Sequence, residues 1–217
     1  MQPRRSVRSY QEIPLEPAAV SALQKEIDAC NKGGGLQIQL VTNEPKAFDS
    51  FMAHYGKFSG VKNYIALIGP KSAGLDEKLG YYGERLALLA QSLGLNTCWA
   101  AMTFGKGAAK SRCTVASGER LVCVLALGNG VTQGTAHISK PMDALCRVNG
   151  AMPEWFRKGM EGAMLAPTAM NQQKFLISLN GNTVTARSLG GFYSKVDLGI
   201  VKYHFEAAAG KENFSWG

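Results

Sequence analysis

The segment from residue 75 to residue 93 constrains the fold of this chain more than any other. Its apolar side chains recur every three or four residues, as they do along one face of an α-helix. They are Leu79, Tyr82, Leu86, Leu89, Ala90 and Leu93, and Gly94 follows where a C-terminal cap belongs. A helix with one apolar face must pack against another element, so the sequence predicts a layered globular fold.

Shorter patterns on both sides predict a mixture of helices and strands. Helical spacing predicts helices over residues 17–30, 46–55, 105–111, 153–165 and 195–209, and a helical turn over 141–146. Apolar runs or alternation predict strands over 36–42, 63–68, 95–102 and 120–127. Asn180-Gly181-Asn182 predicts a hairpin between 175–179 and 183–187. No repeat or linker interrupts the pattern, so we expect one α+β domain over residues 1–217.

Composition excludes several classes of protein. The chain has 217 residues, of which 46% are hydrophobic and 18% are charged, so it can bury a core. Its five cysteines are scattered without a CxxC pair and its three histidines are dispersed, which argues against a disulfide framework or a metal site. No signal peptide and no apolar run of about 18 residues is present. We therefore expect a cytoplasmic protein that binds no metal and no membrane.

The net charge of +8 predicts an anionic partner, and the basic residues concentrate only in Arg4-Arg5-Ser6-Val7-Arg8. Guanidinium groups match phosphate oxygens, and a serine adds one more hydrogen bond. If the run is helical, Arg8 lies one turn onward and reaches another part of the ligand. Taken alone, a solvated basic terminus is the better interpretation. No basic stretch is interleaved with aromatic residues, so a small anion is favoured over nucleic acid.

Two other segments carry groups that suit a ligand. Gly94-Leu95-Asn96-Thr97-Cys98-Trp99 leaves the long helix, and Trp99 and Cys98 there can line a flat apolar slot or simply pack in the core. The loop Ala166-Pro167-Thr168-Ala169-Met170-Asn171-Gln172-Gln173 is rich in hydroxyl and amide groups. Its alternative role is a polar connection that caps a helix.

The predicted last helix carries three residues to which we assign structural roles. Asp197 near its start is interpreted as a dipole partner or cap, and His204 as structural. Gly199 within the helix predicts close packing against another element. No catalytic triad, Walker loop or dinucleotide fingerprint is present, so any catalysis must come from a cofactor.

Taken together, these segments resemble the FMN-dependent nitroreductase family. The run from Arg4 to Arg8 is similar to its N-terminal phosphate-and-flavin motif, and residues 83–99 are similar to its central helix and flavin-facing turn. The loop 166–173 resembles its Pro-Ser-x-x-Asn-x-Gln-Pro-Trp motif. That loop comes late here, before Val196–Ile200 and His204–Glu206, an order similar to the branch called "putative TM nitroreductase".

The resemblance implies a nitroreductase-like α+β fold, with a mostly antiparallel central sheet surrounded by helices. It also implies FMN contacts by position. Arg4, Arg5 and Ser6 would bind the phosphate and ribityl oxygens, and Arg8 would lie at the pyrimidine edge of the ring, where a cation stabilises the reduced flavin. The other implied contacts are Thr97, Cys98, Trp99, Lys140, Pro167, Thr168, Met170, Asn171 and Gln173.

The activity implied by the resemblance is a ping-pong reduction on FMN. NADH or NADPH would reduce the flavin, and a nitroaromatic, quinone or similar acceptor would then take two electrons, with no side chain acting as a catalytic acid. Family members usually form homodimers, so a homodimer is expected. The alternatives are a non-catalytic flavin- or nucleotide-binding protein for sensing or storage and, on charge alone, a nucleic-acid binder. Lys174-Phe175 replaces the family's Pro-Trp, which bears on substrate preference more than on FMN.

Overall fold

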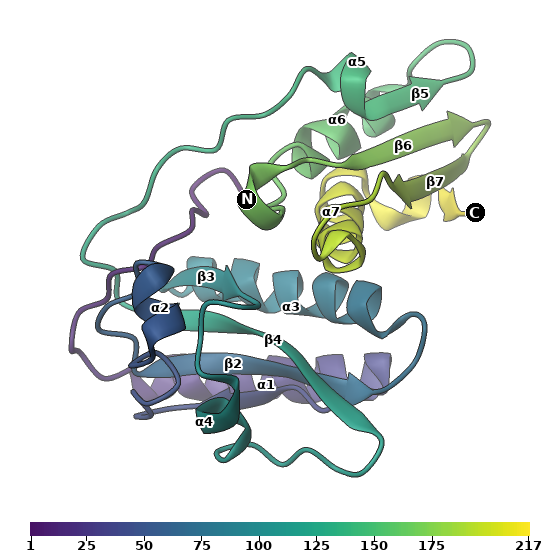
Figure 1. Cartoon of the computed structure of the whole chain (residues 1–217). Helices are drawn as coiled ribbons and strands as arrows, with labels where there is room; N and C mark the ends of the chain where they lie inside the picture. The colour runs from purple at the N-terminus through teal and green to yellow at the C-terminus, as the bar shows by residue number, and fades with distance from the viewer. The chain divides into compact units, whose positions relative to one another are not determined.

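The structure is a computed structural model that describes all residues from 1 to 217 (Figure 1). Its contacts divide the chain into two compact units. The first-sheet unit comprises Pro3–Leu75 and Arg85–Ala136, and the second-sheet unit comprises Met1–Gln2, Asp76–Glu84 and His137–Gly217. The mixed α+β architecture and the antiparallel sheet predicted from the sequence are confirmed, whereas a single domain over 1–217 stays a prediction.

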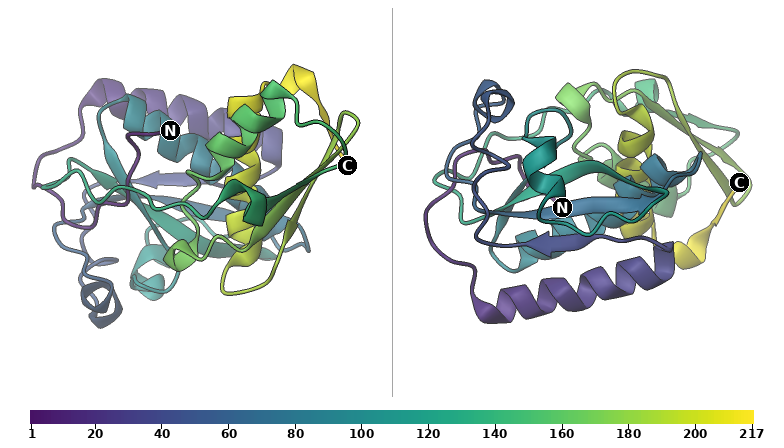
Figure 2. Two further views of the ribbon diagram at one scale, coloured as in Figure 1. Left: turned by 90° about the horizontal axis from the view of Figure 1, so that it is seen from above. Right: turned by 60° about the horizontal axis from the view of Figure 1, so that its bottom comes forward.

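The first-sheet unit is built on a four-stranded antiparallel sheet in the order β1-β2-β4-β3. The strands are β1 (Gln39–Val41), β2 (Asn63–Pro70), β3 (Asn96–Ala100) and β4 (Glu119–Gly128). Helices α1 (Pro17–Gly34) and the later part of α3 (Leu75–Ser92) lie on one face, and α2 (Phe51–Tyr55) and α4 (Lys106–Lys110) lie toward the other (Figure 2). The sheet therefore has helices toward both of its faces.

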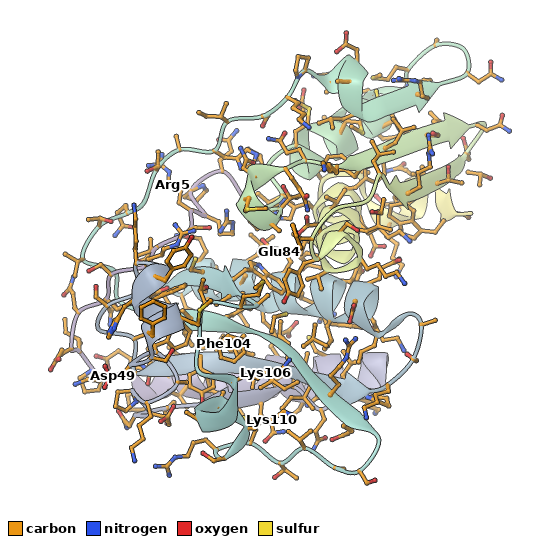
Figure 3. The ribbon with its side chains drawn as sticks, viewed as in Figure 1. Arg5, Asp49, Glu84, Phe104, Lys106 and Lys110 are labelled. Atoms are coloured by element: carbon orange, nitrogen blue, oxygen red, sulfur yellow. The ribbon has the colours of Figure 1, made fainter.

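The central strands β2 and β4 are buried along almost their whole length, because helices lie on both faces. Toward α2 and α4, an apolar cluster contains the packed rings of Phe48, Phe58, Tyr64 and Phe104. Figure 3 shows Phe104 just before α4, which carries Lys106 and Lys110. Val7 and Cys98 also belong to this cluster, so the N-terminal segment and β3 share one core.

The second-sheet unit has its own four-stranded sheet, in the order β5-β6-β7-β8. The predicted hairpin is present as β6 (Phe175–Asn180) and β7 (Thr183–Ser188), flanked in parallel by the short β5 (Cys146–Val148) and β8 (Ser215–Trp216). The helical elements are α5 (Met142–Leu145), α6 (Glu154–Ala163), α7 (Ser194–Ala209) and the 3-10 turns η1 (Ala169–Asn171) and η2 (Lys211–Asn213).

Helix α7 packs closely against the first part of α3, as Gly199 predicted. A Cβ atom on Gly199 would collide with the backbone oxygen of Glu77 and lie 2.6 Å from the nitrogen of Tyr81. His204 is fully buried, within 2.9 Å of the Glu84 carboxylate and 3.0 Å of the Gly162 carbonyl oxygen, in agreement with a structural role. Figure 3 shows Glu84 on α3 beside α7.

Three predicted elements have an end that differs from the structure by three residues or more. The strand expected over 36–42 is shortened to β1, although the Gln37 N–H still donates to the Ile68 carbonyl of β2 at 2.9 Å, and the Asn31 side chain binds the N–H and the carbonyl of Ile38 on the outer edge. The helix expected over 46–55 begins at Phe51, because the Ser50 hydroxyl accepts the Ala53 N–H as an N-cap. Helix α1 continues to Gly34 and ends where Gly35 adopts a left-handed conformation. No helix of the chain is long and apolar enough to cross a membrane.

Candidate flavin site

The basic run at the N-terminus is extended, so the expectation that Arg4 to Arg8 forms a helical turn is wrong. Ser6 forms a parallel β-bridge with Thr97 at the edge of β3, and the Val7 N–H donates to the Thr97 carbonyl at 3.1 Å. The free edge of β3 offers unpaired backbone groups, and this pairing satisfies them better than a local helical turn would.

Extension sorts the side chains of the run onto two sides. Arg5 and Val7 both lie beside Gly134, where a Cβ would meet their side chains at 3.0 and 3.4 Å. Arg5 also donates to the Gly134 carbonyl at 3.4 Å, and Figure 3 shows it beside the connection after β4. Arg4, Ser6 and Arg8 alternate with them and point the other way. The sequence order Arg-Arg-Ser therefore does not correspond to one spatial cluster.

Burial divides these cations further. Arg4 is 5% exposed, whereas Arg8 is exposed. A guanidinium stays charged at any physiological pH, and a buried one is normally held by hydrogen bonds or by an anion. Arg4 is therefore positioned by the surrounding fold, and Arg8 is accessible.

The three residues singled out on β3 also point in two directions. Cys98 lies in the core cluster at 2% exposure, so it faces away from Thr97 and Trp99, which alternate with it. Burial raises the pKa of the Cys98 thiol, while the charge of Arg8, a hydrogen bond with Ser6 and the charge of Arg4 act to lower it. The thiol is therefore in reach of the field of the basic run but is kept neutral by burial.

Thr97 provides a more direct sign of an incomplete site. Its side chain is 2% exposed, and its hydroxyl oxygen has no hydrogen-bond partner. A buried hydroxyl without a partner costs about 1–3 kcal/mol, so such groups are rare unless another molecule satisfies them. Thr97 carries this hydroxyl directly at the bridge to Ser6.

The amide-rich loop of the second-sheet unit is cross-linked by its own side chains. The Thr168 hydroxyl accepts the Gln173 N–H at 2.9 Å. The Gln173 amide accepts from the Lys140 N–H at 2.8 Å and donates to the Ile138 carbonyl at 2.8 Å and to the Asn171 side chain at 3.0 Å. All polar atoms of the buried Gln173 side chain are thus used within the protein.

The remaining predicted residues of this unit differ in exposure. Met170 is 81% exposed and Asn171 is exposed, although its amide also donates to the Ile138 carbonyl at 2.9 Å. The Lys140 ammonium donates to the carbonyls of Gln172 and Gln173 at 2.8 and 3.3 Å, so it braces the loop. Pro167 lies half-buried just before the loop's hydrogen-bonded turn.

One residue outside the predicted set also holds this loop. Asp197 of α7 accepts the Ala169 N–H at 2.9 Å and a Gln172 side-chain N–H at 2.7 Å. From its position near the helix start, the sequence indicated a cap or dipole role for Asp197. Its role in holding the loop was missed, because the partners lie 25 and 28 residues earlier and leave no local pattern. In the first-sheet unit, Asn96 at the start of β3 fixes the turn after β4, because its side-chain oxygen accepts the Gly130 N–H at 2.9 Å.

The geometry thus comprises a cation and hydroxyl set at the edge of β3 and, in the other unit, a braced amide loop. The sequence matches the family described as "Putative TM nitroreductase" over residues 1–209. The chain belongs to this family. Its nitroreductase-like fold, expected from the motifs, is therefore confirmed.

Solved structures of nitroreductases share this fold at low sequence identity. A "putative nitroreductase" from Thermotoga maritima is 20% identical, with a TM-score of 0.62 over 94% of this chain and 79% of that one. An "FMN-dependent nitroreductase" from Clostridium difficile is 19% identical, with a TM-score of 0.50 over 62% of this chain and 88% of that one. A "putative nitroreductase in complex with FMN" from Desulfovibrio desulfuricans is 16% identical, with a TM-score of 0.53 over 69% and 94%. None of the curated proteins matches this chain.

Proposed function

We propose that the protein is an FMN-dependent oxidoreductase that uses NADH or NADPH for the two-electron reduction of nitroaromatics, quinones or similar acceptors by a ping-pong mechanism. The observation that carries the proposal is the set of arginines and hydroxyls at the edge of β3 in a chain of the nitroreductase family. FMN, when bound, supplies the hydride chemistry. The residues of the chain bind and orient it.

The donors at the edge of β3 suit a phosphorylated flavin. Guanidinium and hydroxyl groups are the side chains that recognise phosphate, and Arg4, Ser6 and Arg8 lie along one side of the extended run. The Thr97 hydroxyl lacks a protein partner, so a ligand oxygen or nitrogen would satisfy it. Within this proposal, Arg4 and Ser6 serve the phosphate and ribityl oxygens and Arg8 stabilises the negative edge of the reduced ring, whereas Arg5 lies on the opposite side of the run, beside Gly134.

The amide loop is proposed to contribute flavin contacts through its exposed members. Met170 and Asn171 are the accessible side chains, whereas Thr168 and Gln173 are buried and already hydrogen-bonded within the protein. We therefore assign direct contact to Met170 and Asn171 and a bracing role to Thr168, Gln173 and Lys140. This division refines the set that the family resemblance implied.

The decisive experiment is spectroscopic. Purified protein, supplied with FMN if necessary, should be yellow, and NADH or NADPH should bleach the flavin band under anaerobic conditions. Adding a quinone or a nitroaromatic compound should then restore the band. Protein that binds FMN but is not reduced by either nucleotide would instead be a non-catalytic flavin-binding protein. Protein that takes up no FMN would contradict both readings.

Arg8 provides the site test within this proposal. Arg8→Ala should weaken FMN binding or make the bound flavin harder to reduce, because a fixed cation near the ring favours its anionic reduced form. Arg120→Ala, which removes another exposed arginine, should change neither property. Equal FMN affinity and equal midpoint potential in Arg8→Ala and the parent protein would refute the role of Arg8.

A homodimer, expected from the family, is tested by light scattering of the same samples.

A further inference from the structure

The loop between α6 and β6 adopts a backbone that two of its residue types, methionine and glutamine, disfavour. Met170, Asn171 and Gln173 have φ values of 51°, 52° and 47°, in the left-handed region. None of them is glycine, and a bulky residue such as methionine adopts this region only when its surroundings impose it. The same short segment exposes 81% of Met170. The loop therefore contains several features that lower stability.

Asp197 holds the loop on both sides of the first two left-handed residues. One carboxylate oxygen accepts the Ala169 N–H at 2.9 Å, immediately before Met170. The other accepts the Gln172 side-chain N–H at 2.7 Å, immediately after Asn171. The same Gln172 nitrogen donates to the Phe192 carbonyl at 2.9 Å, so it is fixed by two acceptors.

Asp197 is itself an unusual choice for this position. It is 7% exposed, and burial raises the pKa of its carboxyl to about 6, although the bonds from Gln172 and Ala169 act to lower it. A carboxylate held in a buried site by neutral donors is expensive to maintain. Such costs tend to be retained where the geometry that they enforce is used.

We infer that Asp197 is a positioning residue: by fixing Ala169 and Gln172, it imposes the left-handed turn at Met170 and Asn171 and so sets how these two side chains meet a ligand. This role for the ligand FMN rests on the function proposed above. Hydrogen bonds of Thr168, Gln173 and Lys140 also hold the loop and do not involve Asp197. Removing the Asp197 carboxylate should therefore loosen the turn locally without detaching the whole loop.

An asparagine cannot replace the carboxylate in this role. Asn at position 197 could still accept the Ala169 N–H, but its own NH2 would face the NH2 of Gln172. Turning the Gln172 amide over would relieve that conflict only by placing its oxygen against the Phe192 carbonyl. Asp197→Asn therefore removes one of the two fixed points while it preserves size. Gln172→Ala removes the same point from the other side.

The test compares Asp197→Asn and Gln172→Ala with Asp143→Asn, a matched change at an exposed aspartate of the same unit. In ligand-free protein, amide hydrogen exchange at residues 169–173 should accelerate about tenfold or more in the first two variants, with exchange in α7 unchanged. FMN affinity at pH 7.5 should fall roughly tenfold, the effect of about one lost hydrogen bond, and the midpoint potential of bound FMN should shift. Asp143→Asn should change none of these.

Each outcome decides the inference. Unchanged exchange at residues 169–173 would overturn it, and so would accelerated exchange with unchanged FMN affinity and potential. Should Asp197→Asn fail to fold, Gln172→Ala provides the same comparison from the surface of the loop. Parent protein that binds no FMN would contradict the proposed function instead, and the exchange measurement on ligand-free protein would then decide by itself whether Asp197 sets the loop.

Discussion

At the scale of single residues, the structure separates side chains that adjoin in sequence. The motif from Arg4 to Arg8 suggested one cluster of cations, but extension turns Arg5 toward Gly134 and leaves Arg4, Ser6 and Arg8 on the other side. Likewise, Cys98 faces the core while its neighbours Thr97 and Trp99 face away from it. Residue types predicted the chemistry of this region, and strand geometry decided which atoms are available for it.

Thr97 yields a prediction in which stability and binding move in opposite directions. Thr97→Val keeps the shape of the side chain and removes a buried hydroxyl that has no protein partner. The free energy of unfolding of the ligand-free protein should rise by about 1 kcal/mol, measured by urea denaturation. FMN affinity should fall several-fold. A destabilised ligand-free variant would mean that the hydroxyl is satisfied within the protein.

Asp197 yields a prediction about pH. Its pKa is raised from 3.8 to about 6 in the fold, so between pH 4 and pH 6 the native state retains a proton that the unfolded chain has lost. The free energy of unfolding should therefore fall as the pH rises through this window, by about 3 kcal/mol from this residue. The measurement is urea denaturation of the parent protein and Asp197→Asn at pH 4, 5, 6 and 7. The free energy of unfolding should fall with pH more steeply in the parent protein than in Asp197→Asn, whereas Asp143→Asn should show the same slope as the parent.

At the scale of elements, the sequence predicted the existence of nearly every helix and strand, while polar side chains decided where several of them begin and end. Ser50 starts α2 by capping it, and Asn31 holds Ile38 just before β1. β5 and β8 are only three and two residues long, and they are recognised as strands by their pairing with β6 and β7 of the hairpin. Local periodicity cannot detect strands of this length.

The packing of α7 against α3 gives a prediction at this scale. Gly199→Ala places a methyl group against the backbone of Glu77 and Tyr81, which cannot withdraw without moving a helix. It should destabilise the protein by about 3 kcal/mol or more, because overpacking against backbone is not relieved by a rotamer change. Gly107→Ala in α4, where a Cβ meets nothing within 4 Å, is the matched control and should stabilise by about 0.5–1 kcal/mol. Thermal and urea unfolding measure both, and equal stability of the two variants would contradict this view of the helix contact.

At the scale of the whole molecule, net charge is the property that follows most directly from the sequence. The net charge of +8 attracts the dianionic phosphate of FMN over a longer range than any hydrogen bond. Raising the ionic strength from about 0.02 M to about 0.5 M should therefore slow FMN association and weaken its binding, because the Debye length shrinks severalfold. Riboflavin, which has the same ring without the phosphate, should show little salt dependence in the same stopped-flow experiment. Equal salt dependence of the two flavins would show that the basic residues do not act on the phosphate.

Periodicity and motif chemistry in the sequence determined the class of fold, most of its elements, the family and the kinds of group that a ligand would meet. These properties depend on local spacing and on residue type, both of which can be read along a single chain. Tertiary structure decided that the N-terminal arginines extend along β3, that the Thr97 hydroxyl is left without a protein partner, and that Asp197 holds a loop from another part of the sequence. Each of these results depends on which backbone groups meet across long separations, and no local pattern in the sequence encodes that pairing.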